Sequence, residues 1–171
     1  MPRLLLILAM ILPAAARAKS SIEEIGDFTQ FIVPAYAFGL AMGEEGYKGA
    51  HQFMYSYGAT FATVHALKQT IDAERPDGSD NKSFPSGHTS SAFSGATFIH
   101  KRYGLKQAAV PYALATFTGW SRIYADKHHT RDVVAGAAIS AAFTWILVDE
   151  YSGFSVSASP GGARVGYRKE F

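Results

Sequence analysis

The most informative stretch of the chain is residues 121–136, "SRIYADKHHTRDVVAG". It places Arg122, two adjacent histidines and Asp132 directly before a strongly apolar segment. Charged side chains beside a buried helix cost free energy unless they have partners or bind a ligand. The stretch therefore predicts that a buried helix, at about residues 130–151, begins at a site built by these polar side chains.

Helical patterning continues on the N-terminal side of this stretch. A capping-box pattern at Ser21 and Glu24 opens a helix that Pro34 is expected to kink or end. Further helices are predicted at about residues 47–74, 88–104 and 106–126, the first of them closed by Arg75 and Pro76. Because no strand alternation precedes the tail, the sequence predicts an all-α fold, a single compact bundle of five or six helices.

The two ends of the 171-residue chain differ from its body. Residues 1–18 combine Arg3, an apolar run and the ending "AARA", which predicts a signal peptide cleaved after Ala18 and an exported protein. The folded domain is then expected at residues 19–151. Residues 152–171 are compatible with a hairpin, a disordered end or an outer-membrane-like strand, and their small polar residues favour a flexible surface tail.

Composition excludes several classes of protein. The chain has no cysteine, so disulfides, thiol catalysis and cysteine-based metal sites are excluded. Cleavage after Ala18 would remove Arg3 and Arg17 from the 16 basic residues, leaving as many as the 14 acidic ones. Nucleic acid is not an expected partner, because its binding needs clustered basic charge.

Two short segments outside the opening stretch offer groups that bind anions. Lys68 and Arg75 are seven residues apart, so a continuous helix would place both on one face, about 10 Å apart along its axis. At the start of the next helix, Ser86 can cap the helix and Gly87 lets a ligand approach the backbone N–H groups. His88 in the first turn can donate a proton to that ligand.

The histidines of the opening stretch have a carboxylate within reach. His128 and Asp132 are four residues apart, so on a helix the carboxylate can orient the imidazole and stabilise its positive charge. His129 is three residues from Asp132, and spacing alone does not exclude it. The same three residues offer metal-ligand types, but HExxH is absent and three cations nearby would repel a metal ion, so no metal site is expected.

Three motifs together resemble a known family. Lys68-x6-Arg75-Pro76, then Pro85-Ser86-Gly87-His88, then Ser121-Arg122-x5-His128-x3-Asp132 resemble the three-part signature of the type 2 phosphatidic acid phosphatases. Their superfamily also includes bacterial class A acid phosphatases and vanadium haloperoxidases. The resemblance covers about residues 47–151, and it departs from many soluble relatives in the short gap between Pro76 and Pro85.

The resemblance implies a role for each motif residue. His128 would attack phosphorus and become a phosphohistidine, Asp132 would orient it, and His88 would protonate the leaving oxygen and later activate water. The phosphoryl oxygens would be bound by the remaining motif residues, Lys68, Arg75, Ser86, Gly87 and Arg122. No metal or other cofactor is implied.

The expected function is hydrolysis of a lipid-linked phosphate or pyrophosphate, such as phosphatidate, phosphatidylglycerophosphate, undecaprenyl pyrophosphate or lipid A. The alternative is a soluble periplasmic acid phosphatase of broad specificity. A haloperoxidase and a non-catalytic lipid-phosphate binder are further alternatives, although binding alone would not need two histidines. Apolar segments interrupted by polar residues favour a periplasmic enzyme at the membrane surface over one with several spans.

Overall fold

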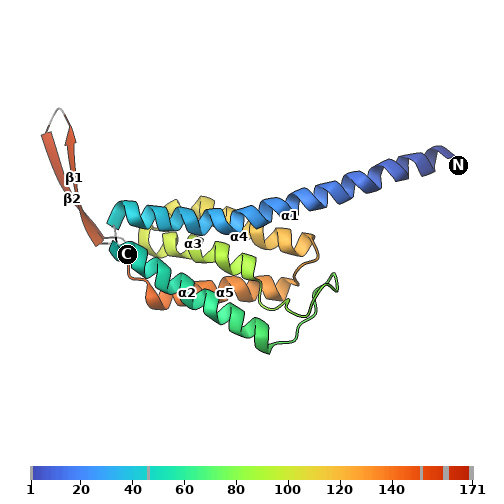
Figure 1. The fold of residues 1–171 in the computed structure, drawn as a ribbon. Helices are drawn as coiled ribbons and strands as arrows, with labels where there is room; N and C mark the ends of the chain where they lie inside the picture. The colour runs from blue at the N-terminus through green and yellow to red at the C-terminus, as the bar shows by residue number, and fades with distance from the viewer. Residues whose placement is uncertain (1, 46, 151, 160–161, 170–171) are drawn as a thin grey trace.

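The computed structural model describes residues 2–45, 47–150, 152–159 and 162–169. Within these residues the chain forms five helices and a C-terminal hairpin (Figure 1). The elements are α1 (Pro2–Glu45), α2 (Tyr47–Thr70), α3 (Gly87–Tyr103), α4 (Leu105–Tyr124), α5 (Thr130–Leu147), β1 (Ser152–Ser159) and β2 (Gly162–Lys169). The predicted all-α bundle is confirmed, with the hairpin appended to it.

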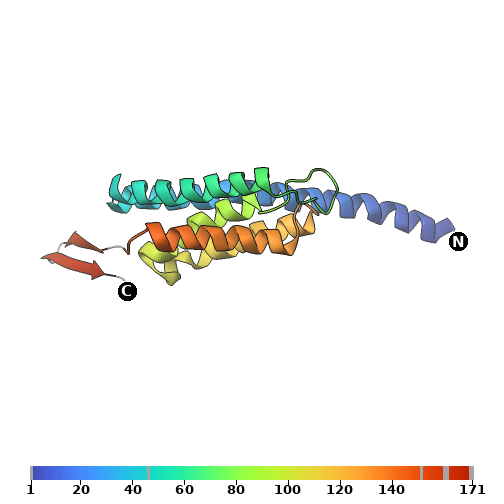
Figure 2. The same ribbon diagram turned by 90° about the horizontal axis from the view of Figure 1, so that it is seen from below.

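Helix α3 lies at the centre of the bundle and contacts each of the other four helices (Figures 1 and 2). Its buried residues include Ala92, Ala96, Phe98 and Ile99, which form the two apolar clusters of the core with residues of α1, α2 and α4. Towards α5 the contacts are more polar, and the Ser140 hydroxyl donates to the Ser90 carbonyl at 2.7 Å. Small residues on α3 therefore let four helices surround a fifth.

Helix α1 is longer than the sequence indicates, because it begins before Ser21 and continues through Pro34. A proline cannot donate to the carbonyl four residues before it, here that of Gln30. The Ser91 hydroxyl of α3 donates to this carbonyl at 2.8 Å, so the acceptor that Pro34 leaves free has a partner. The predicted cleavage after Ala18 falls within α1 and stays a prediction.

Helix α2 is shorter than predicted, ending at Thr70 instead of near Glu74. Residues 71–83 fold back on themselves, with the Ala73 amide donating to Asn81 at 3.0 Å and the Ser83 amide donating to Ala73 at 2.9 Å. The expected helical face shared by Lys68 and Arg75 is therefore wrong, because Arg75 lies in the loop.

The α2–α3 and α4–α5 loops meet at one end of the bundle, and the hairpin lies at the opposite end (Figure 1). The Asp77 amide donates to the Asp126 carbonyl at 3.1 Å and joins the two loops. The strands pair antiparallel from Ser152 with Lys169 to Ser159 with Gly162. Of the conformations that the sequence leaves open for the tail, its described part forms the hairpin. Over the part of the chain described, no helix has the length and apolarity needed to cross a membrane.

Candidate active site

The three motifs meet where the two loops join, at the N-terminal ends of α3 and α5. The Ser86 amide donates to the Asp132 carbonyl at 2.9 Å, and Arg75 Nη1 lies 3.4 Å from His128 Nε2. Lys68 Cε is within van der Waals reach of a Cβ placed on Gly87. Residues of all three motifs therefore lie close together around one small volume.

His128 lies in the α4–α5 loop, two residues before α5 begins, and is 3% exposed. Its Nδ1 is 3.8 Å from Asp132 Oδ2, too far for a direct hydrogen bond, so the expected helical contact between them is wrong. The Ser83 hydroxyl lies between them, donating to Asp132 Oδ2 at 2.5 Å with its oxygen 3.4 Å from His128 Nδ1. The carboxylate thus reaches the imidazole through a buried serine.

His129 has a different environment from its neighbour. It is the N-cap of α5, and its amide donates to Asp132 Oδ2 at 2.9 Å. Its ring Nε2 is 3.2 Å from the Glu74 carbonyl in the α2–α3 loop. Of the two adjacent histidines, only His128 contacts the motif cations.

Two of the three motif cations come from α2 and the loop that follows it. Lys68, in the last turn of α2, donates from Nζ to the Lys82 carbonyl at 2.6 Å. Arg75 pairs through Nε with Asp80 at 2.7 Å and points Nη1 at His128. Burial and then Arg75 lower the pKa of Lys68 to about 8, so the two cations repel each other across the site.

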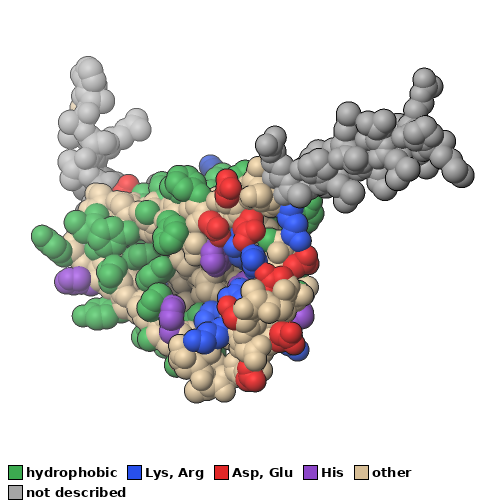
Figure 3. Space-filling view, turned by 45° about the vertical axis from the view of Figure 1, so that its right-hand side comes forward, with side chains coloured by type: hydrophobic (Ala, Val, Ile, Leu, Met, Phe, Trp, Pro, Cys, Tyr) green, Lys and Arg blue, Asp and Glu red, His purple; other side chains and the backbone are tan. Residues whose placement is uncertain are grey.

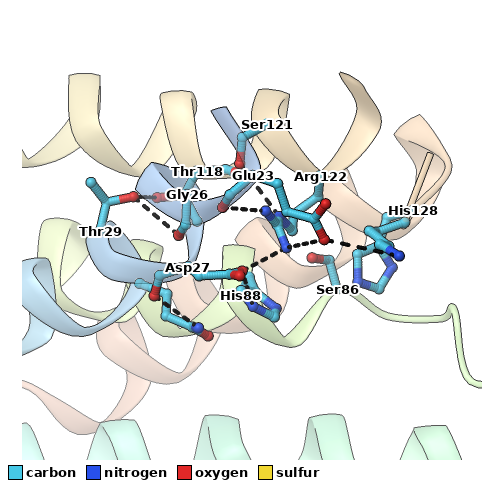
Figure 4. A network of polar contacts seen from close by, with 12 residues as sticks. Glu23, Gly26, Asp27, Thr29, Ser86, His88, Thr118, Ser121, Arg122 and His128 are labelled. Atoms are coloured by element: carbon cyan, nitrogen blue, oxygen red, sulfur yellow. Dashed lines mark hydrogen bonds and ion pairs between the residues drawn. The ribbon is translucent and has the colours of Figure 1, made fainter. Parts of the chain in front are cut away.

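The third cation, Arg122, is buried in the last turn of α4 and faces α1. Figure 4 shows its guanidinium and His88 directed at the carboxylate of Asp27. Arg122 Nη1 is 2.7 Å and His88 Nε2 is 2.9 Å from the same Asp27 Oδ1. Arg122 Nη2 also donates to the Glu23 carbonyl at 2.7 Å.

The start of α3 is built as the sequence predicts. Ser86 is its N-cap, and its hydroxyl accepts from the Thr89 amide at 3.4 Å and the Thr89 hydroxyl at 2.9 Å. Gly136 of α5 lets α3 approach, because a Cβ there would lie 2.6 Å from the Ser86 carbonyl oxygen. The first turn of α3 therefore lies at the site, with α5 packed closely against it.

Both motif histidines have lowered pKa values, so their neutral forms predominate at neutral pH. Burial, then Lys68 and Arg75, lower the pKa of His128 to about 3. Burial and then Arg122 lower the pKa of His88 to about 4. An imidazole that is neutral and close to cations keeps a free lone pair on one ring nitrogen, as a nucleophile needs.

A groove of about 300 Å³ runs from Lys68 and His88 between α1, α2 and α3. Three serines of α3 line one wall, and Phe31 and Phe61 line the other side, 64% and 54% exposed. Figure 3 shows hydrophobic side chains gathered beside the charged and histidine side chains on this face. The charged site therefore continues into an apolar surface.

Sequence reasoning missed Ser83 and the acidic residues of α1. Ser83 is three residues before Ser86 in a polar loop, where nothing distinguishes it from the other serines. Asp27 is 61 positions before His88, and only the packing of α1 against α4 brings it to the site. Among the described residues, no three histidine, aspartate or glutamate side chains gather as a metal site requires.

Comparisons with known proteins agree with this geometry. The sequence model of the PAP2 superfamily matches residues 49–151. The lipid A 4′-phosphatase of Helicobacter pylori is 30% identical over 141 residues, 76% of this chain and 71% of that protein. The lipid A 1-phosphatase of Porphyromonas gingivalis is 42% identical over 90 residues, 51% of this chain and 19% of that protein.

Two solved structures share the fold. The crystal structure of Aquifex aeolicus LpxE has a TM-score of 0.66 at 23% identity, covering 77% of this chain and 85% of the other. A transmembrane PAP2-type phosphatidylglycerolphosphate phosphatase from Bacillus subtilis has a TM-score of 0.59 at 20% identity, covering 77% and 73%. The chain belongs to the PAP2 superfamily, and it is an enzyme that hydrolyses phosphate esters.

Proposed function

We propose that this protein removes a phosphate group from a membrane lipid of the lipid A type, at the periplasmic surface of a membrane. The observation that carries the proposal is the groove that joins Lys68 and His88 to the exposed rings of Phe31 and Phe61. A phosphate held among the cations would leave its organic part in this groove, with an acyl chain against the aromatic rings.

The first step is attack by His128 Nε2 on phosphorus. Its Nδ1 faces the Ser83 hydroxyl, which itself donates to Asp132, so this chain of contacts favours the proton on Nδ1 and the lone pair on Nε2. Arg75 lies on the Nε2 side, where a phosphoryl group would be bound. The new N–P bond forms as the bond from phosphorus to the lipid oxygen breaks.

His88 acts in this step in its protonated form: it gives its proton to the departing lipid oxygen, and then takes one from the water that attacks phosphorus and breaks the N–P bond. The electron pair of that bond returns to His128 Nε2, and inorganic phosphate is released. Lys68, Arg75 and Arg122 stabilise the charge on the phosphoryl oxygens in both steps, assisted by the first amides of α3.

The lipid substrate class is supported by the surface as well as by the site. Large apolar side chains are exposed along α1, α2, α4 and α5, which is unusual for a monomeric soluble domain. The two curated relatives act on lipid A, as their names state. These observations do not favour the alternative of a soluble acid phosphatase of broad specificity.

The experiment is phosphoenzyme trapping with a lipid A-type substrate labelled in its phosphate, in EDTA. Samples are quenched in alkaline detergent, where a phosphorus–nitrogen bond survives. We expect label on the wild type and on His129→Ala, but none on His128→Ala, which has no nucleophile. His129→Ala should lose at most about tenfold in turnover, or about 1.4 kcal/mol. Label that persists in His128→Ala, or activity that needs added metal, would contradict the mechanism.

A further inference from the structure

Asp27 of α1 places a carboxylate inside the cluster of motif residues, although no motif contains it. Its Oδ1 is 2.7 Å from Arg122 Nη1 and 2.9 Å from His88 Nε2, so one oxygen contacts both groups (Figure 4). The match to the superfamily begins at residue 49, so Asp27 lies outside it. The side chain is 46% exposed, so it is not sealed in the core.

The position of Asp27 is fixed by the packing of α1 against α4. Gly26 faces Ser121 so closely that a Cβ on Gly26 would overlap the Ser121 hydroxyl. One turn further along, the buried hydroxyls of Thr29 and Thr118 are 2.7 Å apart. The backbone contact at Gly26 and the hydroxyl contact at Thr29 thus hold the helix in register with the turn that carries Arg122.

We propose that Asp27 is a positioning residue of the phosphatase: it orients the leaving-group acid His88 and holds Arg122 until a phosphoryl group replaces it there. The proposal rests on the proposed function, because it assigns Asp27 to the same reaction. A carboxylate shared between an arginine and an imidazole resembles a phosphoryl oxygen in charge and in hydrogen-bonding geometry.

The charges around His88 give Asp27 an effect on protonation. The groups that face His88 are Asp27 from α1, Arg122 from α4, His128 from the α4–α5 loop, and the cations Arg75 and Lys68 from α2 and its loop. Asp27 is the one acidic group among these five, and it raises the pKa of His88 against burial and the cations. Without it, His88 would hold its proton less often, so a smaller fraction of the enzyme could act as the acid.

Removing the charge of Asp27 should therefore change two kinetic quantities in opposite directions. Turnover should fall, because His88 is less often protonated and is no longer oriented. Affinity for phosphate should rise, because Arg122 no longer has a competing anion. A residue that merely supports the fold would not increase phosphate affinity while it lowers turnover.

The test uses the full chain with Asp27→Asn, Asp27→Glu and the matched control Glu24→Gln, an exposed carboxylate on the same helix. For Asp27→Asn we expect about a tenfold fall in kcat on an alkyl phosphate, a much smaller fall on an aryl phosphate, and about threefold tighter inhibition by inorganic phosphate. The basic limb of kcat/KM should move to lower pH. Asp27→Glu should restore part of the kcat, and Glu24→Gln should match the wild type.

Three results would overturn the proposal. One is wild-type kcat and phosphate inhibition in Asp27→Asn. Another is a loss of kcat that is equal for alkyl and aryl phosphates with unchanged phosphate inhibition. The third is an Asp27→Asn variant that thermal unfolding shows to be unfolded, because Asp27 would then have a structural role instead. Failure of the proposed function is separate, since it would appear as a wild type that hydrolyses no phosphate ester or forms no phosphoenzyme on His128.

Discussion

His128 is held in a site with two cations on one side and a carboxylate reached only through Ser83 on the other. Burial, then Lys68 and Arg75, lower its pKa to about 3. The ring therefore stays neutral at neutral pH, and Nε2, which we propose as the nucleophile, keeps its lone pair. The lowered pKa also affects stability, because the pKa of His128 in the unfolded chain is the ordinary value of 6.5.

Below pH 6.5 the unfolded chain protonates His128 and the folded chain does not. The unfolded state then binds more protons, so stability is lost as the pH falls from about 6.5 towards 3. We expect the free energy of unfolding to decrease by about 2 kcal/mol more between pH 7 and 4.5 in the wild type than in His128→Asn. Denaturant unfolding at several pH values measures this difference.

The matched control is the exposed His51, and His51→Asn should keep the wild-type pH dependence. Part of the decrease should remain in His128→Asn, because His88 also has a lowered pKa, about 4. If the free energy of unfolding depends on pH equally in the wild type and His128→Asn, the ring is protonated in the folded protein, which contradicts the lowered pKa of His128.

The sequence motifs identify many residues of the site, but they miss the residues that only tertiary packing brings there. Lys68, Arg75, His88 and His128 gather at one end of the bundle as the resemblance implies. Ser83 and Asp27 have no spacing rule that connects them to the motifs, so their proximity depends on tertiary structure. The spacing of His128 and Asp132 predicts a contact only where both lie on one helix, and His128 lies before α5 begins.

At the scale of elements, helix existence was predictable and helix ends were not. Apolar periodicity marks the segments that became α2 to α5, since their buried faces must repeat with the helix turn. The end of α2 at Thr70 depends on backbone hydrogen bonds between residues 73 and 83, which join parts of a loop and leave no local signal. The passage of α1 through Pro34 depends on a hydroxyl from α3.

The junction of α3 and α5 gives a prediction for a single methyl group. In Gly136→Ala the new Cβ would meet the Ser86 carbonyl, so α5 or the first turn of α3 must shift. We expect a loss of about 1–3 kcal/mol in stability and a fall in kcat larger than unfolding alone explains, because the amides of this turn move. Thermal unfolding and single-turnover kinetics measure the two effects.

Gly58→Ala is the control for this change, because nothing lies within 4 Å of a Cβ at that helical position. It should leave kcat unchanged and raise stability by about 0.5–1 kcal/mol, as alanine does in a helix. If Gly136→Ala is as stable and as active as the wild type, the close contact between α5 and the Ser86 turn does not shape the site.

Across the whole molecule, the charged site lies at one end of the bundle and the exposed apolar side chains lie along its helices (Figure 3). The groove between α1, α2 and α3 connects the two regions. The sequence indicated apolar helices and a polar site, but the direction in which the site opens depends on how the helices pack. We propose that this opening takes a lipid.

The most direct test is the ratio of kcat/KM for a long-chain phosphomonoester lipid in mixed micelles to that for its short-chain, water-soluble homologue. We predict a ratio of at least about 100, which is about 2.7 kcal/mol, or the burial of roughly three to four CH₂ groups. Phe61→Asp should lower the ratio, and Phe28→Asp, equally a change of an exposed phenylalanine but outside the groove, should not. Equal kcat/KM values for the two chain lengths in the wild type would contradict the account and return the protein to the class of broad-specificity phosphatases.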